Sequence, residues 1–492
     1  MEKDCRGACH RLVIPADFAV EYLDIFLMMP NVYNIIAELC ANIVSSCTEK
    51  FFVEYSCISP DERNRVYGVV RAGIPALFED ADSDGEPSVR ELLQGDLTES
   101  FYENLSVMVA RLKAENDCYV MVGLLQILDQ SMAGLLKQAV TELESESFSL
   151  VLNTNRESIG VGLLPRCSCV WERKHRLVHS YNHIESFLYN FLLIENSVLG
   201  DLIDKHYFLK KELFPHFGER NSIKIAATPL SLERNFTVQL GGTDKIQYFN
   251  IVYNKTSFEF ENELIWKKIW TAAQNGSDIV VFPELLGNPD MVDFVSNKIK
   301  ALSPADAEKI PSLLILPSYW DHNRNVVAVL DKYGNLVCKQ NKQNPYRKEF
   351  GGVGFLERIN PSLVVNILHF EGLGRIAILI CRDFLTTRYM EQLMRCFRLT
   401  LIVVPSFSTG SYDFRRSFDL CAHEDCNVVW INTCAALIKG KEANFQDIGY
   451  VRKRISRAED EAQMLFKMPI CEGAFKGECK HDCIYYEIIQ GV

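Results

Sequence analysis

The sequence of 492 residues lacks several features that mark particular classes of protein. It has no apolar run of about 18 or more residues, so no transmembrane helix is expected. Its opening residues, MEKDCRGACHRLVIPADF, do not contain the apolar core of a signal peptide. Its net charge of -12 argues against broad nonspecific binding to nucleic acid, which needs a basic surface. We therefore expect a soluble cytoplasmic protein that does not bind membranes.

A disulfide framework is not indicated either, although the chain has 17 cysteines. The number is odd and the spacing is irregular, whereas secreted disulfide domains are short and usually have an even count. We therefore expect free thiols in a reducing compartment. A tail segment offers Cys471, Cys479, His481 and Cys483 as metal ligands, but it lacks the paired spacing of zinc sites. We predict no metal site and no cofactor.

The first part of the chain has the periodicity of helices. Apolar residues recur three and four positions apart over residues 18–47, 98–116, 122–147 and 180–214. We therefore predict a mainly α-helical N-terminal domain over residues 1–218, whose role the sequence does not indicate.

From residue 219 onward the pattern changes. Short apolar runs rich in Val and Ile alternate with amphipathic helical segments such as residues 260–276. The runs span residues 222–230, 277–285, 312–320, 326–334, 375–383, 399–407 and 427–434. This alternation predicts an α/β layered domain over residues 219–492.

Three reactive side chains lie at or near the ends of these apolar runs. Glu284 and Cys381 each close one run, and Lys342 lies eight residues after a turn at Gly334. In layered α/β domains, functional sites are built at strand ends and in the loops that follow. A single buried cysteine usually reflects core packing, so Cys381 gains meaning only together with the other two residues.

Five blocks in order resemble the carbon–nitrogen hydrolase, or nitrilase, superfamily over about residues 222–455. They are SIKIAATPLSLERN, AAQNGSDIVVFPELLG, the Gly334-to-Lys342 spacing, IAILICRDF followed by LTLIVVPSF, and FDLCAHEDCNVVWINTC. The resemblance implies a four-layer α-β-β-α sandwich. It also implies hydrolysis of a nonpeptide C–N bond, most simply in a small-molecule amide, and assembly into a homodimer or larger homo-oligomer.

The resemblance further implies a role for each of the three residues. Glu284 matches the general base, Lys342 the electrostatic partner and Cys381 the nucleophile that forms a thioester. These roles suit the chemistry, because a thiol with a pKa of about 8.5 needs help to become a thiolate. Lys339 and Lys348 are alternatives to Lys342 in the same block.

A second glutamate and an arginine complete the predicted site. Glu357 and Glu349 both match the family's second glutamate, which positions the substrate and the lysine, and Glu357 matches its turn better. Arg382 departs from the family, which usually has an uncharged residue after the cysteine. Its guanidinium could bind an acidic substrate, or it could pair with Asp383 or Glu424 and hold the loop.

A different class of function is an alternative. The chain would then be a binding or regulatory protein, with an inactive or secondary nitrilase-like domain and a helical domain that recognises a protein partner. Nitrilase-like domains also occur beside reverse transcriptases in bacterial defence proteins, although no YxDD-type polymerase motif is present here.

Overall fold

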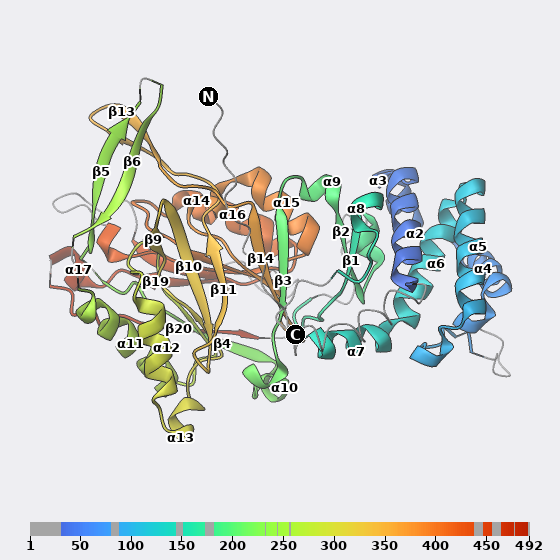
Figure 1. The fold of residues 1–492 in the computed structure, drawn as a ribbon, viewed down its shortest axis with the longest axis horizontal. Coiled ribbons are helices and arrows are strands. Elements are labelled where there is room, and N and C mark those ends of the chain that lie inside the picture. The colour runs from blue at the N-terminus through green and yellow to red at the C-terminus, as the bar shows by residue number, and fades with distance from the viewer. Residues whose placement is uncertain are drawn as a thin grey trace, which may run out of the picture.

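The computed structural model describes most of the chain. The described residues are 31–79, 88–143, 151–172, 182–231, 233–243, 245–254, 257–436, 446–454, 464–476 and 478–490. They form a helical part, followed by two large stacked sheets with helices on their outer faces (Figure 1).

The helical part has a hydrophobic core of its own, in which Ile36, Leu105 and Leu125 are fully or almost fully buried. Its elements are α2 (Val32–Ser46), α3 (Glu49–Tyr55), α4 (Pro60–Gly73), η1 (Pro75–Leu77), η2 (Gln94–Asp96), α5 (Glu99–Glu115), α6 (Cys118–Ser131) and α7 (Ala133–Leu143). These helices confirm the prediction for the described part of this region, whereas residues 18–30 and 144–147 of the predicted helical segments lie outside the described residues. None of the described helices is by itself long and apolar enough to cross a membrane, and the bent pair α6–α7 passes that test by length and composition.

The predicted helix over residues 180–214 is wrong. Between residues 156 and 220, the described part of the structure has short elements. They are α8 (Arg156–Ile159), β1 (Val161–Pro165), η4 (Ile184–Phe187), β2 (Phe191–Glu195), α9 (Asn196–Leu199), β3 (Ile203–Phe208), η5 (Lys211–Leu213) and α10 (Phe217–Arg220). All five residues of β2 are buried, and a short apolar run that is buried on both faces cannot be told from a helix by spacing alone.

Strands β1 and β2 connect the helical part to the rest of the molecule. They pair as an antiparallel ribbon, and their alternate side chains enter two different cores. Leu163 and Leu193 pack with the helices, whereas Leu164 and Leu192 pack with the core between the large sheets. The carboxylate of Asp129 on α6 accepts hydrogen bonds from three consecutive backbone N–H groups, at residues 189–191, and so fixes the start of β2.

The first large sheet has the strand order β11-β10-β8-β7-β4-β20, with β9 paired to β10. Its strands are β4 (Ser222–Ala227), β7 (Ile279–Val281), β8 (Leu313–Ile315), β9 (Tyr319–Asp321), β10 (Arg324–Asp331), β11 (Leu336–Asn341) and β20 (Tyr485–Gln490). The central strands β4, β7 and β8 are parallel.

The second large sheet has the order β19-β18-β17-β16-β15-β14-β3. Its remaining strands are β14 (Val364–Phe370), β15 (Gly374–Ile378), β16 (Leu401–Pro405), β17 (Asn427–Ile431), β18 (Asp447–Arg452) and β19 (Leu465–Pro469). Each of the seven predicted apolar runs therefore contains a strand. The edge strand β3 pairs in parallel with β14 over six residue pairs, so a strand from before the predicted domain boundary at residues 218–219 completes this sheet.

Side chains from both sheets share one buried core, which shows that the sheets stack face to face. Ile225 and Val281 of the first sheet pack in the same cluster as Ile376 and Val403 of the second. Helices cover the outer faces: α11 (Glu259–Gln274), α12 (Met291–Lys300) and α13 (Pro304–Ala307), and α14 (Arg382–Leu385), α15 (Thr387–Phe397) and α16 (Tyr412–His423) (Figure 1). The amphipathic segment predicted over residues 260–276 is α11.

A smaller sheet projects from one end of the stack (Figure 1). Its order is β12-β13-β6-β5, and its strands are β5 (Phe236–Gly242), β6 (Gln247–Tyr253), β12 (Arg347–Phe350) and β13 (Val353–Glu357). The two remaining elements are η6 (Cys434–Ala436) and α17 (Glu472–Lys476). The last residue of β13 is Glu357, so this sheet delivers one of the predicted site residues.

Candidate active site

Glu284 lies three residues after the end of β7 and is 1% exposed. One oxygen, Oε1, accepts hydrogen bonds from Asn325 Nδ2 and from Lys342 Nζ, both at 2.8 Å. The other, Oε2, accepts the backbone N–H of Phe407 at 2.8 Å. A buried carboxylate needs such partners because burial strongly disfavours its charged form. The side chain is therefore held in one orientation.

Lys342 follows β11 directly and is 2% exposed. Its ammonium nitrogen lies 2.8 Å from Glu284 Oε1 and 2.8 Å from Glu357 Oε2. Glu357 also accepts the backbone N–H of Tyr346 at 2.9 Å. The lysine thus bridges two buried carboxyl groups. The structure brings Glu284, Lys342 and Glu357 together as the sequence predicts.

The competing residues of the same block lie elsewhere. Glu349 is an exposed residue that pairs with Arg347 at 3.1 Å. Lys339 is exposed, and the ammonium of Lys348 lies over the ring of Phe350. Glu357 and Lys342 therefore lie in the buried cluster, whereas Glu349, Lys339 and Lys348 do not.

Cys381 lies three residues after the end of β15, in the turn that leads into α14. It is 6% exposed, and its backbone N–H donates to the carbonyl of Pro405 at 2.9 Å. Its thiol lies close enough to the carboxylate of Glu284 for each side chain to shift the pKa of the other. A thiol, two carboxylates and an ammonium therefore lie in one buried cluster, built from the ends of β7, β11, β13 and β15.

The turn at Cys381 has a strained backbone, with φ 49° and ψ -99°. Left-handed φ values cost a residue with a Cβ atom about 1–2 kcal/mol, whereas glycine adopts them freely. We expect Cys381→Gly to have a free energy of unfolding about 1 kcal/mol higher than Cys381→Ala. Urea unfolding of both variants measures the difference, and equal stability would contradict the assignment of strain to this turn.

The pKa values reflect this burial. Burial raises the pKa of the Cys381 thiol, the negative charge of Glu284 raises it further, and Lys342 opposes both. Burial also raises the pKa of Glu284, against the lowering effect of Lys342. For Lys342 itself, burial acts to lower the pKa, but the two carboxylates outweigh it and the pKa is raised. Cys381 therefore keeps its proton at neutral pH, beside the carboxyl group of Glu284 and the ammonium of Lys342.

Arg382 does not hold the loop in the way the sequence suggested. Its side chain is exposed, and among the described residues it forms no ion pair with Asp383 or Glu424. The carboxylate of Asp383 is instead buried and accepts backbone N–H groups from Gln343 and Asn344, next to Lys342. The pairing prediction is wrong, because the nearby backbone donors satisfy Asp383 without a cation.

Sequence reasoning missed three contributors to the cluster. Asn325, the second residue of β10, orients Glu284, and the backbone N–H of Phe407 after β16 binds the same carboxylate. Asp383 was considered only as a partner of Arg382. The available signal for Asn325 was its position as a polar residue directly before the apolar run that begins at Val326. The identity of Phe407 gives no sign that its backbone N–H binds a carboxylate.

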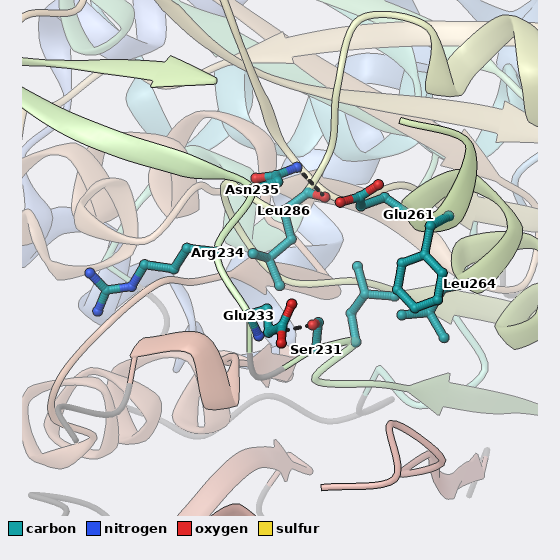
Figure 2. Close-up of a pocket in the computed structure, with 9 residues that line it drawn as sticks. Ser231, Glu233, Arg234, Asn235, Glu261, Leu264 and Leu286 are labelled. Atoms are coloured by element: carbon teal, nitrogen blue, oxygen red, sulfur yellow. Dashed lines mark hydrogen bonds between the residues drawn. The ribbon is translucent and has the colours of Figure 1, made fainter. Parts of the chain in front are cut away.

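No group of three or more metal-ligating side chains within the described part of the chain is arranged to hold a metal ion. A separate pocket borders the segment that follows Glu284 (Figure 2). It is lined by Leu230, Ser231, Glu233, Arg234, Asn235, Phe260, Glu261, Leu264 and Leu286. Asn235 donates to the carbonyl of Leu286 there, and none of the lining residues belongs to the cluster around Cys381.

No protein-family model and no curated protein matches the chain. Among solved structures, an amidase from Nesterenkonia sp. matches with 14% identity and a TM-score of 0.36, over 55% of this chain and 90% of that chain. A branch 10 member of the nitrilase superfamily from Saccharomyces cerevisiae matches with 15% identity and a TM-score of 0.34, over 55% and 90%. At this level of similarity, the activities of those proteins do not transfer to this chain. Solved structures of nitrilase-superfamily amidases thus match about half of this chain at low sequence identity.

Proposed function

We propose that this protein hydrolyses a nonpeptide C–N bond of a small-molecule amide, through a thioester on Cys381. The observation that supports the proposal best is the buried cluster in which Lys342 bridges Glu284 and Glu357 at 2.8 Å each, beside the Cys381 thiol. A nucleophile, a base and an electrostatic partner in mutual contact are what covalent amide hydrolysis requires. The sequence blocks that resemble the nitrilase superfamily give the same assignment.

In the first half of the proposed reaction, the Cys381 sulfur attacks the carbonyl carbon while its proton passes to Glu284. Lys342 and the backbone N–H of Arg382 stabilise the negative charge that develops on the carbonyl oxygen. The C–N bond then breaks, and the leaving amine takes the proton from Glu284. Because the resting thiol is protonated, this transfer occurs together with the attack and no free thiolate accumulates.

In the second half, water hydrolyses the thioester. Glu284 takes a proton from the water molecule, whose oxygen attacks the acyl carbon, and the sulfur leaves and recovers the proton. Glu357 holds Lys342 in place through both halves, because its carboxylate forms a second ion pair with the ammonium. The exposed Arg382 lies next to the nucleophile in the chain and is available to a substrate that bears a carboxylate.

The first test is the reactivity of Cys381 toward iodoacetamide. The intact protein is labelled at limiting dose, and peptide mapping by mass spectrometry gives the extent at each of its 17 cysteines. We expect preferential labelling of Cys381 in the wild type and about a tenfold slower reaction in Glu284→Gln, because the base that accepts the thiol proton is lost. Glu349→Gln is the matched control, since that glutamate is exposed and distant from the cluster.

Two results would count against the proposal. The first is labelling of Cys381 at the rate of the other buried cysteines, such as Cys338. The second is an equal effect of Glu284→Gln and Glu349→Gln. Either result would favour the alternative in which the nitrilase-like part is inactive and the helical part recognises a protein partner.

A further inference from the structure

Asp383 connects the turn that carries Cys381 with the loop that carries Lys342, and the proposed reaction depends on the relative position of these two segments. It lies two residues after Cys381, is 1% exposed, and makes no contact with Glu284 or Glu357 among the described hydrogen bonds. Its carboxylate reaches across to the loop that follows β11 and carries Lys342. A buried carboxylate at this place requires a reason, because Asp is seldom buried without partners.

Four donors converge on this carboxylate. Oδ1 accepts the backbone N–H of Asn344 at 2.7 Å and the Asn344 side-chain amide at 3.0 Å, and the backbone N–H of Gln343 lies at 3.0 Å. Oδ2 accepts the backbone N–H of Ile380 at 3.3 Å. The two residues after Lys342 and the residue before Cys381 are thus bound to one side chain.

The lysine loop has other attachments near this point. The Lys342 ammonium pairs with Glu284 and Glu357, and its backbone N–H donates to the carbonyl of Asn325 at 2.9 Å. The side-chain amide of Gln343 donates to the carbonyl of Asn341 in the first large sheet and to that of Val364 on β14 in the second. Among the hydrogen bonds of the described residues, those of Asp383 tie this loop to the turn that carries Cys381.

We propose that Asp383 is a positioning residue that sets the place of the Lys342 ammonium relative to the Cys381 sulfur. This inference rests on the proposed function. Asp383 acts through the backbone of the lysine loop and touches no reacting atom. A displacement of about 1 Å between catalytic groups can lower the rate about 100-fold. Loss of the hydrogen bonds that Asp383 makes between the two segments should therefore have a measurable effect.

The test compares Asp383→Asn with a matched control, Asp204→Asn. An amide keeps the size of the carboxylate but presents an NH2 group to N–H donors, so at least one of the four donors loses its acceptor. The side chain of Asp204 is also largely covered, at 7% exposed, and pairs with Arg156 and His206, with no hydrogen bond to the lysine loop among the described residues. Asp204→Asn therefore reports the general cost of removing a buried carboxylate charge.

Two readouts are measured on the full chain at neutral pH. Hydrogen exchange followed by mass spectrometry gives the protection of the backbone amides of Gln343 and Asn344. Iodoacetamide labelling gives the rate at Cys381 relative to Cys338 in the same sample. For Asp383→Asn we expect about tenfold faster exchange of the two amides and about tenfold slower relative labelling of Cys381. For Asp204→Asn we expect both values to equal those of the wild type.

The outcomes separate this inference from the proposed function. Unchanged hydrogen exchange of the Gln343 and Asn344 amides in Asp383→Asn would overturn the inference. Faster labelling of Cys381 would overturn it too, because Asp383 would then limit the access of iodoacetamide to the thiol and not position Lys342. If wild-type Cys381 shows no preferential labelling, the proposed function fails, and the exchange of the two amides still decides whether Asp383 fixes the loop. Equal effects of both aspartate variants would reduce Asp383 to a stabilising residue and refute the inference.

Discussion

Replacing Cys381 by alanine is expected to lower amide hydrolysis by about 10⁴-fold or more, because covalent catalysis has no substitute for the nucleophile. The sulfur is buried and lies beside the carboxylate of Glu284. The measurement is release of ammonia or amine from a panel of short amides. Cys381→Ser should also be nearly inactive, since a serine hydroxyl is a much weaker acid than a thiol.

Cys396→Ala is the matched control for this variant. Cys396 is also a buried cysteine, on α15 and away from Glu284. Its replacement should leave the rate within about twofold of the wild type, with a loss of unfolding free energy of about 1 kcal/mol, in keeping with the removal of one buried atom. If Cys381→Ala retains the wild-type rate on an amide substrate, the thioester mechanism is wrong.

Lys342→Met should destabilise the protein by about 3–5 kcal/mol at neutral pH. Lys342 neutralises two carboxylates that are both 3% exposed or less, and methionine fills a similar volume without the charge. Removing one partner of a buried ion pair leaves an uncompensated charge, which is the costly case. Unfolding by urea measures the loss, and Lys339→Met, at an exposed lysine of β11 three residues before Lys342, is the control.

The pH dependence of this effect has a definite sign. Burial already raises the pKa of Glu284 against the lowering effect of Lys342, so without the ammonium that pKa rises further above its value of about 4.3 in the unfolded chain. The folded state then binds protons more readily, so the variant loses stability as the pH rises through those values. We expect a smaller deficit at about pH 5 than at about pH 8. The double variant Lys342→Met/Glu284→Gln should recover part of the deficit at the higher pH, and a deficit that does not change with pH would contradict this account.

The strands of the two large sheets were predictable because their residues are apolar in near-continuous runs. Burial on both faces produces such runs, and β7 and β16 are fully buried. The same property explains the error at β2, where the run FLLI fits a helix and a strand equally well. Only the long-range pairing with β1 decides between them, and pairing partners are not visible in local spacing.

The site was predictable as far as side chains carry a signal of their own. Glu284, Lys342 and Cys381 stand at the ends of recognisable blocks, and Glu357 precedes a turn. Asp383 was misassigned because an adjacent arginine suggests an ion pair, whereas its real partners are backbone N–H groups of a loop about 40 residues earlier in the chain. Such partners leave no trace in the identity of the residues that supply them.

The pairing of β3 with β14 limits how this chain can be divided. If the gene were split after residue 218, the second product would expose the unpaired edge of β14 over the length of six residue pairs. An open edge of this kind pairs readily with other chains and promotes aggregation. Recombination that separates the helical part from the rest would therefore be selected against unless the break falls before residue 203, where β3 stays with its sheet.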